Sequence, residues 1–213
     1  TLQVDGAITS SSTINGVGIK FNVTNFTNSL LISNDAGTGT LSTANNNTGL
    51  GNDVFNVLTS GDQNTAVGAE AMDALTEGSN NTAVGYEALG KHTTGTDCTG
   101  VGRAALLDNT SGSGNCAFGV EALENGNGCN NTVAIGKQAG RSISTGSNNM
   151  LLGTSSGNSG SPGGAITSGN NEVTIGNGDH SKINVQVSLS VASDQIDITD
   201  FQPLSAGLDF VNQ

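Results

Sequence analysis

The chain has 213 residues, and its 32 glycines, 6 phenylalanines, single tyrosine and lack of tryptophan leave few side chains bulky enough for an ordinary globular core. Its formal net charge of −12 disfavours nucleic acid and anionic membrane surfaces as partners. The sequence has no run of about 18 apolar residues and no secretory-signal pattern at its start, so we expect no membrane insertion.

Residues 1–47 are predicted to form an N-terminal strand or stalk segment. Apolar residues at Val17, Ile19, Phe21 and Val23 alternate with smaller or polar ones, the period of a half-buried strand. A looser Asn/Thr/Gly stretch follows and ends at Asn47. We find no turn dipeptide joining this strand to a similar neighbour, and therefore predict that it has no partner within the chain.

Residues 48–153 carry a 17-residue repeat that predicts stacked coils. An apolar residue precedes each repeated glycine, and a small residue then an apolar one follow at the third and fourth positions after it. We call these glycines the grid glycines and number positions in each coil from them; they are Gly51, Gly68, Gly85, Gly102, Gly119, Gly136 and Gly153. The predicted fold is all-β, a parallel β-solenoid or β-roll, in which the x-E-A-L part of the repeat could form one helical turn.

Residues 154–182 are predicted to hold an inserted loop and the last repeat. An eighth copy of the motif ends at Gly176, 23 residues after Gly153, and we place the six extra residues in the Gly/Ser/Pro stretch Ser155–Ser168. We assign Gly176 and the grid glycines a structural role. Residues 183–193 alternate as a further strand, and a helix is expected to begin after Pro203. We expect the chain to be part of a longer protein.

The composition of one coil predicts an oligomer. Each coil offers only about three sizeable apolar side chains, whereas each glycine costs roughly 0.5–1 kcal/mol relative to alanine when it is ordered. Pooling several copies around one axis would bury more apolar surface for the same number of ordered residues. We therefore expect a parallel homotrimer in which like coils lie at like heights.

Acidic residues recur two positions after the grid glycine, at Asp53, Glu70, Glu87 and Glu121. Coils about 4.8 Å apart would stack these carboxylates into a ladder, which could bridge a divalent cation. The alternative is an exposed acidic column, partly neutralised by Arg103 and Lys137 and screened by water. We favour the second interpretation and expect neither a metal nor a cofactor.

Asparagines recur four positions before the grid glycine, and we expect their stacked amides to pin the register of the coils. They are Asn47, Asn64, Asn81, Asn115 and Asn149.

The remaining reactive side chains form no recognisable site. Cys98, Cys116 and Cys129 are an odd number; the first two could lie on adjacent coils, but we interpret all three as small apolar or edge thiols. His92 and His180 are isolated, and we predict both at the surface. No Ser/His/Asp set, phosphate loop or pocket-forming carboxylate pair is present, so we expect no enzyme activity.

Two segments resemble known families. The repeat N-T-A-V-G-Y-E-A-L at Asn81–Leu89 resembles the head repeats of trimeric autotransporter adhesins and, more closely, the 17-residue versions in bacteriophage tail fibres. The run Ser193–Gln213 resembles the start of the endosialidase-type intramolecular chaperone that closes many phage fibres. Residues 194–213 would then be the beginning of a truncated, helical chaperone region.

The second resemblance implies a self-cleavage junction at Ser193 and Asp194. Chaperones of this family template trimer folding and then cut themselves off beside this serine, with a lysine as its activating partner. Here Ile196 and Ile198 occupy the positions of the family's basic residues. Without the lysine the serine hydroxyl lacks the base that it needs, so we predict an inactive junction.

Together the resemblances imply a structural virion fibre, a phage tail fibre or similar extracellular appendage. Its partners would be itself as a homotrimer, other virion tail or adaptor proteins, and a host surface glycan or protein receptor. One alternative is the head domain of a bacterial trimeric adhesin. A second is a tailspike polysaccharide depolymerase, which would need two carboxylates about 5–9.5 Å apart in a groove.

Overall fold

The computed structural model describes residues 12–14, 17–21, 24–33 and 38–180, with side chains described from residue 24 onward. The predicted strand at 183–193 and the chaperone-like segment 194–213 lie outside the described residues, and so does the predicted junction at Ser193 and Asp194.

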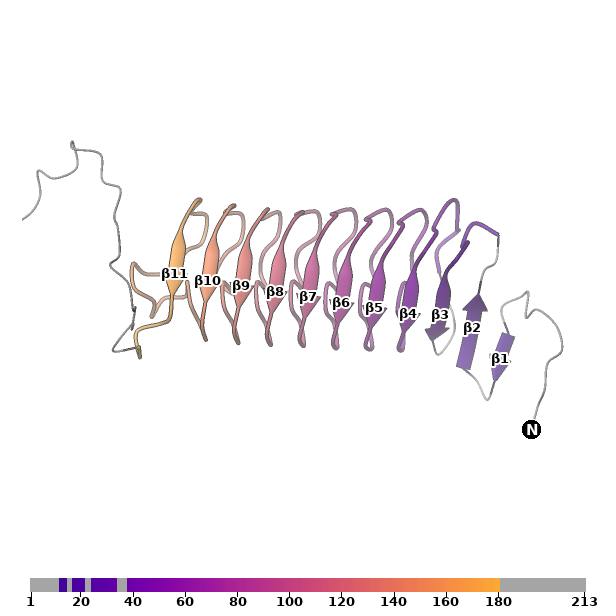
Figure 1. The fold of residues 1–213 in the computed structure, drawn as a ribbon, viewed down its shortest axis with the longest axis horizontal. Coiled ribbons are helices and arrows are strands. Elements are labelled where there is room, and N and C mark those ends of the chain that lie inside the picture. The colour runs from indigo at the N-terminus through magenta and orange to yellow at the C-terminus, as the bar shows by residue number, and fades with distance from the viewer. Residues whose placement is uncertain (1–11, 15–16, 22–23, 34–37, 181–213) are drawn as a thin grey trace, which may run out of the picture. The chain divides into compact units, whose positions relative to one another are not determined.

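Within the described residues, eleven short strands form one sheet whose order follows the chain (Figure 1). From β4 to β10 each turn of the chain brings the next strand beside the previous one, and neighbouring strands pair 17 residues apart, as Thr65 with Thr82. The nine strands from β3 to β11 are parallel, so the predicted all-β parallel β-solenoid is confirmed, and no helix occurs in the described part of the chain. The strands are β1 (Ser12–Ile14), β2 (Val17–Phe21), β3 (Leu30–Ser33), β4 (Thr48–Leu50), β5 (Thr65–Val67), β6 (Thr82–Val84), β7 (Thr99–Val101), β8 (Cys116–Phe118), β9 (Val133–Ile135), β10 (Met150–Leu152) and β11 (Val173–Ile175).

The N-terminal strands differ from the prediction. β2 pairs antiparallel with both β1 and β3, so the expectation that this strand has no partner within the chain is wrong. The overlooked signal is Asn15-Gly16, which lies between β1 and β2 and is the dipeptide preferred in two-residue hairpins. β3 pairs in parallel with β4, Leu30 opposite Thr48, so the parallel stack begins one strand before residue 48.

The interior of each coil is narrow, so small strand residues face inward and larger ones face outward. The middle residue of each strand, at position −2, is buried, and its neighbours at −3 and −1 point outward. Gly49 occupies this inward position, where a Cβ would come within 2.7 Å of Leu31 Cδ1 and 2.9 Å of Val54 Cγ1. Only small side chains fit there in most coils, because residues at positions +3 and +4 fill the space opposite.

The grid glycines are required by the backbone, as predicted. Their φ angles lie between 110° and 149°, a region that side chains exclude. A Cβ on Gly85 would lie 2.6 Å from the carbonyl oxygen of Gly102, the grid glycine of the next coil. Gly176 has a φ of 82°, and a Cβ there would instead meet the ring of His180.

The x-E-A-L segment is a turn rather than the helical turn that we considered. Its residues at positions +2 and +4 have left-handed φ angles, 58° at Glu70 and 51° at Met72. Such angles cost roughly 1–2 kcal/mol per non-glycine residue. Met72 is fully buried, and burying a side chain of its size contributes about 1.5–3 kcal/mol, which offsets the strain. Burial of the side chain at position +4 therefore stabilises a backbone conformation that the local sequence disfavours.

The asparagine column fixes the register of neighbouring coils, as predicted. Its side-chain amides do so mainly by hydrogen bonds to backbone groups of the next coil. Asn64 Oδ1 accepts the backbone N–H of Asn81 at 2.9 Å, and its Nδ2 donates to the carbonyl of Gly78 at 2.9 Å. Asn64 Nδ2 also lies 3.1 Å from Asn47 Oδ1, a contact between two amides. Each side chain thus ties its own coil to the next one.

Two coils carry another residue in this column, Cys98 and Thr132, and the first of them shows a compensating change. Cys98 replaces the column asparagine, and Asn109 supplies the missing amide from position +7: its Nδ2 donates to the Gly112 carbonyl at 3.1 Å. Asn109 Oδ1 accepts the Gly112 N–H at 2.9 Å, and Cys98 Sγ lies 3.3 Å from the same carbonyl. Asn109 at position +7 therefore compensates for the loss of the column asparagine at Cys98.

The insertion before the last repeat leaves the stack intact. β11 pairs with β10 in register, Met150 opposite Val173, across the 23-residue spacing. The backbone N–H of Ile166 bonds to the Gly157 carbonyl, and its side chain is only 5% exposed. The extra residues therefore form a loop beside the coil, as predicted.

Candidate functional site

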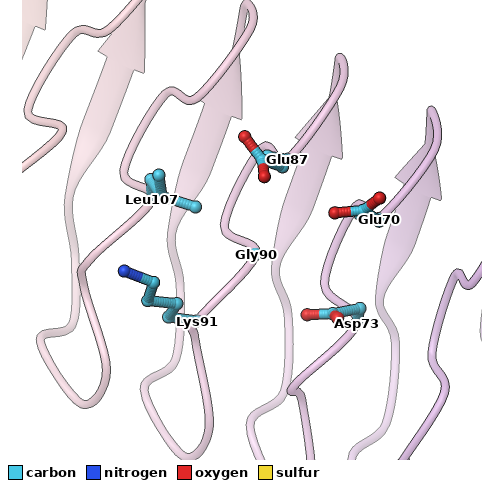
Figure 2. A pocket seen from close by; sticks show the side chains of 6 residues that line it. All are labelled: Glu70, Asp73, Glu87, Gly90, Lys91 and Leu107. Atoms are coloured by element: carbon cyan, nitrogen blue, oxygen red, sulfur yellow. The ribbon is translucent and has the colours of Figure 1, made fainter.

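Two of the acidic residues that the sequence singled out, Glu70 and Glu87, border a small hollow on the surface (Figure 2). Glu70 and Asp73 come from one coil, Glu87, Gly90 and Lys91 from the next, and Leu107 from the third. Gly90 leaves the space open, and a Cβ there would lie 3.1 Å from Leu107 Cδ1. The volume of about 180 Å³ is below the ≈ 300–1,000 Å³ of typical ligand pockets.

The electrostatics of the hollow are those of crowded carboxylates. Partial burial, then the neighbouring Glu70 carboxylate, raises the pKa of Asp73. Lys91 pairs with Asp108 at 2.6 Å, and Figure 2 shows its amine pointing away from Glu70 and Asp73. The bond to Asp108 raises the pKa of Lys91. The hollow therefore lacks the converging donors that would orient a ligand.

The carboxylates of the predicted ladder occupy the same position in their coils. Glu70 and Glu87 line the hollow, and Asp53 occupies the same position one coil earlier. Across the residues that the structure describes, no group of three or more His, Cys, Asp or Glu side chains could hold a metal ion.

Glu121, the fourth member of the column, belongs to an ion-pair cluster. It pairs with Arg103 of the preceding coil and, at 3.6 Å, with Arg141, and it accepts a hydrogen bond from Gln138 Nε2 at 2.7 Å. The bond from Gln138, followed by that from Arg103, lowers the pKa of Glu121. Arg103, one of the two predicted cations, and Arg141, which was not predicted, thus partly neutralise the column at Glu121, but its four carboxylate residues are half-buried rather than exposed.

The three cysteines are free and mostly buried. Burial raises the pKa of each thiol, to about 12 for Cys129, and so favours the protonated form at neutral pH. Cys98 and Cys129 face the core, whereas Cys116 is partly exposed at the start of β8. They behave as the small apolar or edge thiols that we predicted.

The prediction for the histidines is correct for one and wrong for the other. His180 is exposed, but His92 is fully buried. It occupies position +7, where two earlier coils carry the core residues Leu58 and Leu75. The signal for burial was the match of His92 to this leucine column, which the isolated histidine by itself does not show.

The outward side of the strands exposes apolar side chains. We call it the strand face: the side chains at positions −3 and −1 of β4 to β11. At position −1 it presents apolar side chains that are 50% exposed at Leu50, 41% at Phe118 and 46% at Ile135. At position −3 it changes from threonine in β4–β7 to Cys116, Val133, Met150 and Val173 in β8–β11. Monomeric proteins rarely expose contiguous apolar surface of this kind.

Comparisons with protein-family models, with curated proteins and with solved structures found no match to this chain. Within the described residues, no helix is long and apolar enough to cross a membrane.

Proposed function

We propose that the protein is a structural, non-enzymatic fibre segment that works as a homotrimer, with three solenoids packed through their strand faces. The observation that carries the proposal is the strand face, because its apolar side chains are exposed and none of its residues is charged. The chain as a whole carries a net charge of −12, so copies meet with least repulsion through an uncharged surface.

The uneven composition of the strand face favours a parallel arrangement. Position −3 is threonine in β4–β7 and apolar or cysteine in β8–β11. Antiparallel packing would set the threonine-rich end of one copy against the apolar end of another, whereas parallel packing matches like with like. Identical coils at one height also repeat the same contact in every coil, which suits closed cyclic symmetry.

The role of such a trimer is inferred from the resemblance of its repeat to phage tail-fibre repeats. We propose an extracellular virion appendage that contacts other virion tail or adaptor proteins and presents its turns to a host surface glycan or protein receptor. In this proposal the acidic hollow is a solvated surface rather than a catalytic groove. Release of oligosaccharides from host polysaccharide incubated with the protein would contradict it and favour a depolymerase.

A matched pair of substitutions tests the strand face. Phe118, 41% exposed on the strand face, and Val57, 40% exposed at position +6 of its coil, outside the strand face, are exposed to the same degree. We expect Phe118→Asp to dissociate the assembly in sedimentation experiments and Val57→Asp to leave it intact.

Cys116 provides an independent readout on the same surface, next to Phe118 in β8. Its alkylation by a maleimide, followed by mass spectrometry, should be at least about tenfold faster in Phe118→Asp than in the parent or in Val57→Asp. Equal labelling and equal mass in all three proteins would refute assembly through the strand face.

A further inference from the structure

The core contains a buried imidazole, that of His92, which the proposed assembly does not use. His92 stands at position +7, after Leu58 and Leu75 and before Asn109, and it is fully buried. An imidazole replaces an aliphatic side chain here without any exposure to water, so its ring nitrogens must be satisfied within the protein or remain unpaired.

The geometry fixes the protonation of this ring. Nδ1 lies 2.6 Å from the carbonyl oxygen of Asn109, an acceptor, so Nδ1 must donate and Nε2 is the unprotonated nitrogen of the neutral ring. Nε2 is buried without a hydrogen-bond partner. Gly95 packs directly against the ring, where a Cβ would lie 2.3 Å from Cε1. A proton added to Nε2 would therefore create a buried cation in a closely packed site.

No charged group compensates for such a cation among the described residues that act on His92. Burial lowers the pKa of His92, and only the backbone at Asn109 and Gly95 acts in the opposite direction. The neighbouring coil carries Asp97, Arg103 and Asp108 outside the core, and its buried titratable side chain is Cys98, whose Sγ lies 3.7 Å from Asn109 Nδ2. Burial raises the pKa of this thiol, so it stays neutral and offers no counter-charge.

We propose that His92 makes the middle of the solenoid acid-sensitive, so that the coils around it open as the pH falls below about 6.5. The neutral ring fits the closed coil, whereas the protonated ring fits only an opened state in which water reaches Nε2. The opened state binds the extra proton, so closing is fully favoured above the ordinary histidine pKa and is weakened as the pH falls through it. The population of the open state rises by at most about tenfold per pH unit.

The buried thiol of Cys98 reports this opening, because its Sγ faces the Gly112 carbonyl in the same part of the core. The full chain in its assembled state is treated with a pyridyl disulfide at pH 7.5 and 5.5, and labelling at Cys98 is followed by mass spectrometry. His92→Leu, which restores the leucine of the column, is the test variant, and His180→Gln, at the exposed histidine, is the control.

We expect the ratio of the Cys98 labelling rate at pH 5.5 to that at pH 7.5 to be up to about tenfold larger in the parent and in His180→Gln than in His92→Leu. Dividing the two rates within each protein and comparing variants removes the pH dependence of the reagent and thiol. Equal ratios in all three proteins would overturn the proposal. In the parent alone, an NMR titration of the His92 Cε1 proton with a midpoint at or above 6.5 would overturn it as well, whether or not His92→Leu folds.

Discussion

Replacing a grid glycine with alanine should destabilise the solenoid more than the same replacement at a glycine where the added Cβ meets no other atom. In Gly85→Ala the new Cβ would lie 2.6 Å from the Gly102 carbonyl oxygen, and the backbone φ of 137° falls where only glycine is comfortable. The backbone strain costs of order 1–3 kcal/mol. The steric overlap adds about 1–3 kcal/mol, because the next coil's backbone must move. We therefore expect a loss of about 2–6 kcal/mol out of a typical 5–15 kcal/mol.

The control is Gly160→Ala in the inserted loop, where a Cβ would meet nothing within 4 Å. Gly126 is off the grid but is unsuitable, because a Cβ there would lie 2.7 Å from Cys129 Sγ. Urea unfolding followed by circular dichroism gives the free energy of each variant, and we expect Gly160→Ala to match the parent within about 0.5 kcal/mol. If Gly85→Ala were as stable as Gly160→Ala, the assigned role of the grid glycines would be wrong.

Two further predictions concern polar side chains. Burial and the Glu70 carboxylate raise the pKa of Asp73, while water still screens the charge, so Asp73→Asn should stabilise the protein at pH 7 by less than about 1 kcal/mol. Thermal melts should show that this gain in stability disappears in acid, where the carboxyl group of the parent is protonated. A gain that stays constant with pH would contradict this reasoning. Asn109→Leu should lower the free energy of unfolding by about 1–3 kcal/mol, because it removes both hydrogen bonds to Gly112. Adding Cys98→Asn to this variant should recover the lost stability. Additive losses in a double-mutant cycle would show that the two positions are independent.

The sequence was sufficient for the repeating frame. The grid glycines, the pair at positions +3 and +4, and the asparagine column each recur at 17-residue spacing, and the structure places them at the coil-to-coil contact, in the core and in the hydrogen-bond ladder. A period of this length constrains the backbone strongly, because every side chain must fit its own copy in the coil above and below.

The local chemistry was harder to predict. Glu-Ala-Leu segments favour helix on propensity, yet Glu70 and Met72 take left-handed angles because the stack needs a tight turn there. His92 was read as a surface residue because histidine is usually polar and accessible, whereas its column position demands burial. Asn109 was not recognised because its role depends on Cys98, eleven residues away in sequence.

The direction of the strand side chains was also not foreseen. Three-residue strands give too little alternation to show which face is buried. The usable signal is the small residue at position −2, such as Ala83, since a thin coil accepts only a small side chain inside and therefore turns Val84 outward.

Sedimentation equilibrium at low micromolar concentration tests the central claim most directly, because assembly through the strand face should be obligatory for folding. We expect one species of three times the 21.1 kDa chain mass, with loss of folded structure whenever the assembly dissociates. A folded, stable monomer of 21.1 kDa would contradict it.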